Sequence, residues 1–216
     1  MSEKERMVAG RLYLAQGEEL KAMRQKGQQL VRLFNGTTEE EKPYRTQLLM
    51  DIFDDVAGDI YIEPTLRVDY GKNITIGKNF YANFDCVMID VAPIKIGDNA
   101  MFGPRVCLYT AGHPIDPTVR NSGLEFGTSI TIGNNVWIGG SAVVNPGVTI
   151  GDNVVIGSGS VVTKNIPSNT IAVGNPCRVI RDITQEDKAF WEDKQAAYWT
   201  EIANEQNTTI KEEVSK

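Results

Sequence analysis

Hydrophobic and polar positions recur every six residues in the middle of the chain. From Ile132 to Val162 every sixth residue is aliphatic, and the residue after it is Gly, Asn or Thr. The fourth residue after each aliphatic one is small or β-branched. An α-helix would repeat its apolar positions about every 3.6 residues and a plain strand about every 2, so neither produces this spacing. The pattern predicts short strands that turn every six residues, with three such steps closing one triangular coil.

The predicted fold is therefore a solenoid. Aliphatic side chains fill its axis, and Gly or Asn takes the tight corners, where a positive φ is needed. Earlier runs at Ile76-Gly77 and Ile96-Gly97 follow the same rule, so the coils are expected to start well before residue 132. A β-sandwich rich in Gly turns is the alternative, but sandwich strands do not keep a six-residue phase over such a length. We assign residues 58–183 to a mainly β solenoid domain.

Helical patterns flank the repeat. We predict an N-terminal helical cap over residues 1–57, because an open solenoid end must be covered. A C-terminal helix and tail are predicted over residues 184–216, with the helix from Thr184 to about Glu205 and a fraying polar tail from Gln206 onward. The aromatic residues of this helix are expected to pack against the solenoid or another subunit. They are Phe190, Trp191, Tyr198 and Trp199.

One segment breaks the repeat and carries the best candidate for chemistry. Residues 112–129 form a polar, Pro-rich excursion that leaves the scaffold and returns in phase. Such an extruded loop is usually functional. His113, the one histidine of the chain, lies at its root, and Pro114 restricts it to extended backbone conformations. An imidazole titrates near neutral pH and suits a general base.

Composition excludes several classes of protein. Of 216 residues, 41% are hydrophobic and 23% are charged, which indicates a folded soluble protein rather than a disordered or membrane-spanning one. The net charge of −6 disfavours general binding to nucleic acid or to a membrane. Three cysteines without CxxC spacing and a charged first segment indicate a cytoplasmic protein. A single histidine leaves no His-based zinc site within one chain, and no metal is expected.

Longer motifs resemble a known family. The repeat is similar to that of the hexapeptide-repeat acyltransferases, and the other motifs resemble the maltose and galactoside O-acetyltransferase branch. These motifs are Ala9-Gly10 with Tyr13, Tyr81-Ala-Asn-Phe84, Gly103-Pro104, Tyr109 to Pro114, Gly123 to Phe126, Asn135 to Gly139 and Val173 to Arg178. The resemblance implies a left-handed parallel β-helix. It also implies acetyl transfer from acetyl-CoA to a sugar hydroxyl, in a homotrimer with sites at the subunit interfaces.

The resemblance also implies roles for individual residues. His113 would be the general base for direct attack in a ternary complex, and Asn83 would stabilise the developing oxyanion. Glu125 would either orient His113 or bind the acceptor. The acceptor pocket would be lined by Arg24, Asp69, Tyr81 and Glu125, although Arg24 can equally be a solvated helix charge.

The acetyl-CoA site would lie on the last coils. Its expected residues are Trp137, Gly139, Gly140, Ser158, Thr163, Lys164, Arg178 and Arg181. Gly139 and Gly140 would let the pantetheine arm approach the backbone, and the cations would meet the phosphates.

Two departures from the galactoside branch bear on the acceptor. Ala15 and Val91 stand where that branch has aspartates, so a maltose or glucose type of acceptor is the better prediction. Other interpretations remain open: an acetyltransferase of the same fold for a galactoside, serine or an antibiotic, or a non-catalytic scaffold. A scaffold would neither bind acetyl-CoA nor depend on His113.

Overall fold

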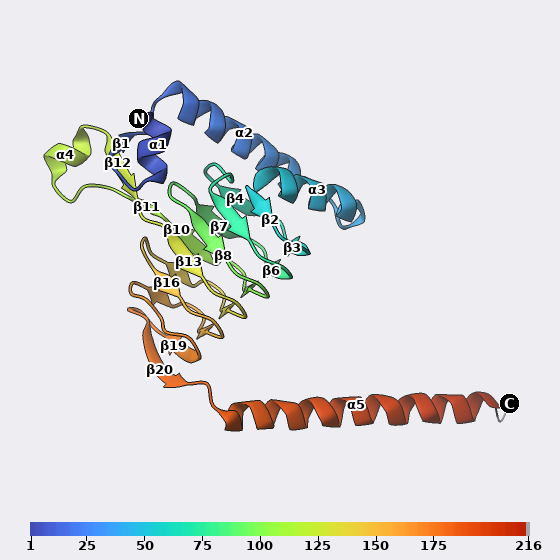
Figure 1. Cartoon of the computed structure of the whole chain (residues 1–216). Coiled ribbons are helices and arrows are strands. Elements are labelled where there is room, and N and C mark those ends of the chain that lie inside the picture. The colour runs from blue at the N-terminus through green and yellow to red at the C-terminus, as the bar shows by residue number, and fades with distance from the viewer. Residues whose placement is uncertain (215–216) are drawn as a thin grey trace. The chain divides into compact units, whose positions relative to one another are not determined.

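A computed structural model describes residues 1–214, with side chains described through Glu205. The chain divides into two units, Met1–Arg181 and a second unit that starts at Asp182. The first unit contains the coils and the N-terminal helices, and the second contains the C-terminal helix (Figure 1).

Three parallel sheets form the faces of a β-helix (Figure 1). The first face consists of β2 (Asp55–Val56), β5 (Ile74–Ile76), β8 (Ile94–Ile96), β13 (Ile130–Ile132) and β16 (Thr149–Ile150). The second face consists of β3 (Ile60–Ile62), β6 (Phe80–Ala82), β9 (Met101–Phe102), β14 (Trp137–Ile138), β17 (Val155–Ile156) and β19 (Thr170–Val173); β20 (Arg178–Asp182), exposed along its length, adds to the same sheet next to β19. The third face consists of β4 (Leu66–Val68), β7 (Cys86–Ile89), β10 (Cys107–Tyr109), β15 (Val143–Val144) and β18 (Val161–Val162). The predicted parallel β-solenoid is confirmed.

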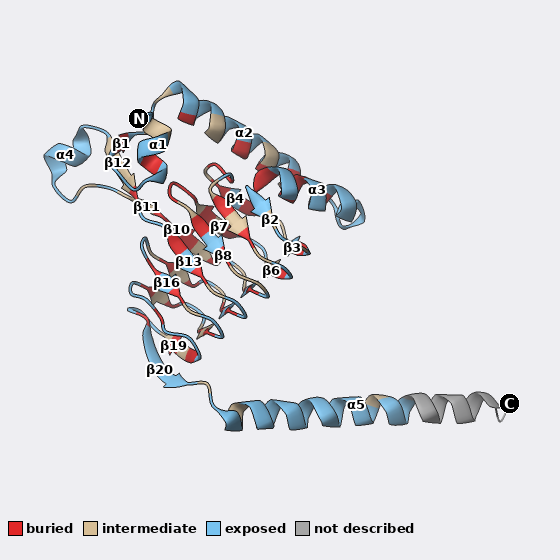
Figure 2. Cartoon of the chain, viewed as in Figure 1, coloured by how far each residue is buried: buried red, intermediate tan, exposed pale blue. Residues whose placement is uncertain are grey.

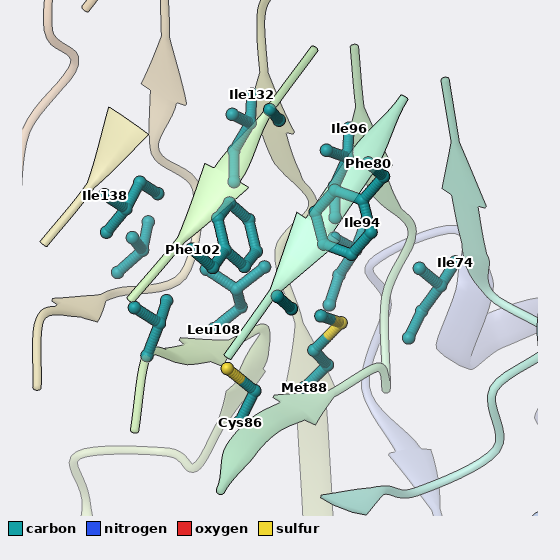
Figure 3. Packing of buried hydrophobic residues seen from close by; sticks show 14 of the residues in the cluster. Ile74, Phe80, Cys86, Met88, Ile94, Ile96, Phe102, Leu108, Ile132 and Ile138 are labelled. Carbon is teal, nitrogen blue, oxygen red and sulfur yellow. The ribbon is translucent and has the colours of Figure 1, made fainter. Parts of the chain in front are cut away.

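The aliphatic residues that repeat every six positions are the residues whose side chains fill the core. Every aliphatic residue that defines it, from Ile132 to Val162, is at most 2% exposed. Aromatic side chains widen the core in the earlier coils, where Phe80 and Phe102 meet edge to face with their ring centres 5.0 Å apart (Figure 3). Burying one aliphatic side chain per strand contributes roughly 1.5–3 kcal/mol each, and this is what holds such short strands together.

The outward rows of the three faces differ in polarity. The first face presents Asp55, Thr75, Lys95, Thr131 and Thr149. The second face presents Tyr61, Tyr81, Met101, Trp137, Val155 and Ile171, and the rings of Tyr61 and Tyr81 stack with centres 5.9 Å apart. The third face presents Arg67, Val87, Cys107, Val143 and Val161. Two faces are thus mainly apolar on the outside, and one is polar.

The N-terminal segment caps one end of the coils. Its helices are α1 (Glu3–Val8), α2 (Glu18–Asn35) and α3 (Lys42–Ile52), with a 3₁₀ turn at Glu39–Glu41. Figure 1 shows α2 and α3 lying across the end of the stack that carries β2, β3 and β4. The buried sides of these two helices join the core of the coils (Figure 2). Strand β1 (Tyr13–Leu14) follows α1 and pairs elsewhere, as described below.

The extruded loop contains regular structure that its sequence did not indicate. Strand β11 (Ala111–Gly112) leaves the coils, α4 (Pro117–Asn121) forms the turn, and β12 (Leu124–Gly127) returns. Asp116 caps α4 by accepting from the Val119 N–H at 3.0 Å. Strands β1, β12 and β11 form a separate three-stranded sheet, so the cap and the loop are joined.

The second unit is built around α5 (Gln185–Val214), which runs further than predicted. The tail predicted from Gln206 onward is assigned to this helix as far as Val214, and its final residues lie outside the described ones. The four aromatic side chains are between 53% and 67% exposed and meet in two edge-to-face pairs. Among the residues that the structure describes, no helix is long and apolar enough to cross a membrane.

Candidate functional site

His113 stands where the chain leaves the coils, at the edge between the third and first faces, called here the His113 edge. Thr110 anchors this point from the core: its hydroxyl donates to the Ile89 carbonyl at 2.7 Å and accepts from the Ala92 N–H at 2.8 Å. His113 follows β11 and is exposed. Its backbone therefore leaves the coils at an anchored point, and the residue itself is exposed to solvent.

The strands on either side of the extruded loop relate Glu125 to His113. Strands β11 and β12 pair antiparallel with Ala111 opposite Gly127 and Gly112 opposite Phe126. Continued by one residue, this register places His113 across from Glu125, and residues opposite one another in such a pair project to the same side. The pairing thus joins the two ends of a segment that carries no repeat, and its extension would bring His113 close to Glu125.

A polar cluster surrounds this edge. Asp69 follows β4, and burial raises its pKa, while Arg24 lowers it and the nearby charge of Glu125 raises it. Arg24 on α2 donates from Nη2 to the Tyr70 hydroxyl at 3.0 Å and to the Ala15 carbonyl at 3.3 Å. Arg24, Asp69 and Glu125, predicted separately, therefore lie close enough to affect one another electrostatically.

Asp90 supports this cluster from inside, a role that the sequence analysis missed. It is fully buried, and its Oδ1 accepts from the N–H groups of Asp69 at 3.0 Å and Tyr70 at 2.9 Å. Its Oδ2 accepts from the Asn73 N–H at 3.3 Å. Burial raises the pKa of Asp90 to about 7, although these backbone donors oppose the shift. The one available signal was an aspartate placed directly after the buried strand β7.

This burial predicts a pH dependence of stability. Because the folded-state pKa of Asp90 is raised from 3.8 to about 7, the folded chain binds more protons than the unfolded chain between these values. The contribution of Asp90 to the free energy of unfolding therefore falls as the pH rises through that window and is constant above it. We expect the difference in unfolding free energy, wild type minus Asp90→Asn, to decrease over the same window.

Urea unfolding of both proteins at a series of pH values measures this difference. Asp98→Asn is a matched control, since Asp98 also accepts from a backbone N–H, that of Lys78 at 2.8 Å, at a more open corner. A difference that stays flat from about pH 4 to about pH 7 would contradict the prediction.

Asn83 lies at another edge, between the second and third faces, called here the Asn83 edge. It directly follows β6 and accepts from the Phe84 N–H at 2.8 Å through Oδ1. In the part of the chain that the structure describes, no group accepts from its Nδ2, so the amide keeps a donor for a ligand. Tyr81 and Trp137 belong to the outward row of the second face, two strands apart, and Trp137 is 55% exposed.

The stacking of neighbouring coils by itself explains why positions 139 and 140 are glycines. A Cβ on Gly139 would lie 2.6 Å from the Ser158 backbone nitrogen, and one on Gly140 would lie 3.1 Å from the Pro104 carbonyl oxygen. The predicted close approach of acetyl-CoA to these residues stays a prediction, because packing between coils already requires small residues there. Ser158 is exposed on the next coil at the same edge.

The remaining predicted acetyl-CoA residues lie elsewhere on the surface. Thr163 and Lys164 follow β18, at the His113 edge, and both are exposed. Arg178 and Arg181 lie on β20; Arg178 is exposed and donates to the Cys177 carbonyl at 2.8 Å. Exposed cations and an exposed indole are the side-chain types that suit a phosphorylated ligand with an adenine ring. No group of three side chains able to hold a metal exists in the described portion.

The predicted residues thus fall on two edges of one chain. His113, Glu125, Asp69 and Lys164 belong to the His113 edge, and Asn83, Gly139 and Ser158 belong to the Asn83 edge. The third face lies between them and is roughly 15 Å wide, at about 3.3 Å per residue. Groups that act on one reacting carbon must come within about 3–3.5 Å of it. Within one chain, His113 and Asn83 therefore lie on different edges, about one face apart.

Models of two protein families match the chain, one in the coils and one in the N-terminal segment. "Bacterial transferase hexapeptide (six repeats)" matches residues 129–164, and "Maltose acetyltransferase hexapeptide capping motif" matches residues 6–58.

Relatives and solved structures that match most of the chain belong to the same family. The galactoside O-acetyltransferase of Escherichia coli is 46% identical over 187 residues, which are 87% of this chain and 92% of the relative. A maltose O-acetyltransferase structure from Clostridium difficile is 54% identical with a TM-score of 0.84, covering 85% of this chain and 98% of that one. A galactoside acetyltransferase solved with coenzyme A is 46% identical with a TM-score of 0.84, covering 87% and 94%. The chain belongs to the maltose and galactoside O-acetyltransferase family of hexapeptide-repeat acetyltransferases.

Proposed function

We propose that this protein transfers an acetyl group from acetyl-CoA to a sugar hydroxyl, with His113 as the general base. The observation that supports the proposal is the pairing of β11 with β12: extended by one residue, its register would place His113 across from Glu125. Glu125 and Arg24 in turn lie close enough to Asp69 to shift its pKa. The names of the relatives, maltose and galactoside O-acetyltransferases, support the same reaction, and one of them was solved with coenzyme A.

The proposed chemistry is a direct transfer in a ternary complex. His113 takes the proton of the acceptor hydroxyl while its oxygen attacks the thioester carbonyl carbon. The carbonyl oxygen becomes an oxyanion, and the Asn83 Nδ2 donates a hydrogen bond to it. The tetrahedral intermediate then collapses, the carbon–sulfur bond breaks, and the imidazolium of His113 returns its proton to the CoA thiolate. The acceptor's proton thus ends on the CoA thiol and the acetyl group on the acceptor oxygen, and no covalent enzyme intermediate forms.

The polar cluster suits a sugar as the acceptor. Asp69 and Glu125 accept hydrogen bonds from hydroxyl groups, whereas Arg24 donates them, so a polyol can satisfy all three. Tyr81 offers a ring face on which a sugar can stack. Ala15 and Val91 remove two carboxylates that the galactoside branch has, and a maltose or glucose type of acceptor fits this less acidic pocket.

For the donor, we place the pantetheine arm along Trp137, Gly139, Gly140 and Ser158. The phosphates would meet Thr163, Lys164, Arg178 and Arg181, whose side chains supply donors on an otherwise acidic protein.

A homotrimer would complete the site. Two of the three outer faces are mainly apolar, and contact between the second face of one copy and the third face of the next would cover both. Such a head-to-tail contact is heterologous and closes as a ring. A site shared between copies would take the Asn83 edge from one copy and the His113 edge from another. Three free cysteines are compatible with a reduced cytoplasm as the location.

Thiol release from acetyl-CoA tests the reaction class. We expect release that depends on glucose or maltose, and less with galactosides, when each is offered separately at equal concentration. A blank without acceptor corrects for the protein's own thiols. Release with serine or chloramphenicol alone would replace the proposed acceptor, and no release together with no acetyl-CoA binding would leave the scaffold as the function.

A further inference from the structure

Tyr13 connects the N-terminal cap to the extruded loop. It lies on β1, which pairs antiparallel with β12 so that Tyr13 stands opposite Glu125 and Leu14 opposite Leu124. Its ring is only 1% exposed. Its hydroxyl donates to Glu125 Oε2 at 2.9 Å, across 112 positions of sequence. A segment that belongs to the cap therefore holds a carboxylate of the candidate site.

Three side chains share one level of the sheet formed by β1, β12 and β11. Tyr13 is opposite Glu125 on one side. The register of β11 and β12, extended by one residue, places His113 opposite Glu125 on the other side. Directly opposed residues in antiparallel strands have Cβ atoms about 4.5–5.5 Å apart and point the same way. With this extension, Tyr13, Glu125 and His113 would form a row across this small sheet.

The side chain at the Tyr13 end of the row is buried and closely packed. The ring packs with Met7, Leu20, Tyr70 and Val91 in a compact apolar cluster. Burial, the hydrogen bond and the charge of Glu125 all raise the pKa of Tyr13, so its hydroxyl stays protonated and remains a donor.

The strand that carries Tyr13 is also held close to the loop. Gly10, with a φ of +70°, lies close to Gly127: a Cβ there would be 3.1 Å from the Gly127 oxygen. One oxygen of Glu125 therefore accepts a hydrogen bond from the cap, and among the described residues no hydrogen bond to the other oxygen is found.

We propose that Tyr13 is a positioning residue for acetyl transfer. By fixing Glu125 Oε2, it turns Oε1 toward His113 and holds the imidazole in the orientation that accepts the acceptor's proton. Tyr13 itself contacts no substrate. The inference rests on the roles proposed for His113 and Glu125, and it assigns Glu125 to orienting His113 rather than to holding the sugar.

Tyr13→Phe tests this directly, because it removes the hydroxyl and keeps the buried ring. We expect kcat to fall roughly 10-fold through misplacement of the base, with the KM for acetyl-CoA within about twofold of wild type. A merely structural role would lower the melting temperature and the active fraction instead, without changing kcat per folded site. Active-site titration with thermal unfolding of each variant separates the two roles.

A double-mutant cycle shows whether the effect passes through Glu125. In a Glu125→Ala background, Tyr13→Phe should cause no further loss of kcat, because the hydroxyl has no carboxylate left to hold. Tyr70→Phe is the matched control: Tyr70 is as buried and lies in the same cluster, but its hydroxyl bonds to Arg24. Its effect should add to that of Glu125→Ala.

The outcomes separate this inference from the proposed function. If Glu125→Ala lowers kcat but Tyr13→Phe leaves it within about twofold of wild type, Tyr13 is not a positioning residue while the proposed reaction stands. An additive loss in the Glu125→Ala background would overturn the inference as well. If Glu125→Ala itself is fully active, both the row and the role of Glu125 are wrong.

Discussion

His113→Ala is expected to lower the turnover of acetyl transfer by roughly 100- to 10,000-fold, the range typical for loss of a general base. A sugar hydroxyl is a weak nucleophile at neutral pH, and no other histidine exists in the chain to replace the base. The fold should be unaffected, because His113 is exposed and follows a strand that Thr110 anchors from the core. Thiol release with saturating acetyl-CoA and sugar measures the loss.

Two controls make this result specific. Lys95→Ala changes an exposed residue in the outward row of the polar first face and should retain wild-type turnover. Added imidazole should restore part of the activity of His113→Ala, since a small base can occupy the vacated space. A His113→Ala protein with near-wild-type turnover would show that another group takes the proton, and the mechanism would have to be abandoned.

Much of the fold was predictable because one physical rule repeats. The inward position of each strand must be aliphatic and the neighbouring coils must stack closely, so the spacing of Ile132, Ile138 and Val144 along the chain already marks the register of the core. Gly139 is constrained in the same way, by the Ser158 backbone 2.6 Å from where its Cβ would be. The family resemblance then named the site residues, but it did not show which of them share an edge of one chain.

What escaped prediction depends on contacts between distant segments. The hydrogen bond from Tyr13 to Glu125 requires β1, which follows the first helix of the cap, to pair with β12 of the loop. A strand of two residues is too short to show a sequence pattern that would predict this pairing. The extruded segment was predicted as a loop because its polar sequence has no regular spacing, although tertiary pairing makes β11 and β12. Asp90 escaped for a similar reason: its three backbone partners lie 17 to 21 positions earlier in the chain.

The division of the site between two edges predicts complementation between inactive chains. Asn83→Ala should lose roughly 100- to 1,000-fold in kcat, as expected for removal of an oxyanion donor, and His113→Ala should be inactive as above. If each site takes the Asn83 edge from one copy and the His113 edge from its neighbour, a mixed assembly contains some sites with both residues intact. Equal amounts of the two chains, unfolded together and refolded, should recover about one quarter of wild-type activity.

The matched control uses two residues of the same edge. Chains carrying His113→Ala and Glu125→Ala should not complement one another, because every His113 edge in the mixture lacks one of the two groups. Recovery in the first mixture and none in the second would show that the site is shared between copies, with the division that the fold indicates. Mixed assemblies that form, as shown by differently tagged chains, but stay inactive would mean that His113 and Asn83 act from the same chain. The roughly 15 Å width of the third face would then have to be bridged by movement of the extruded loop.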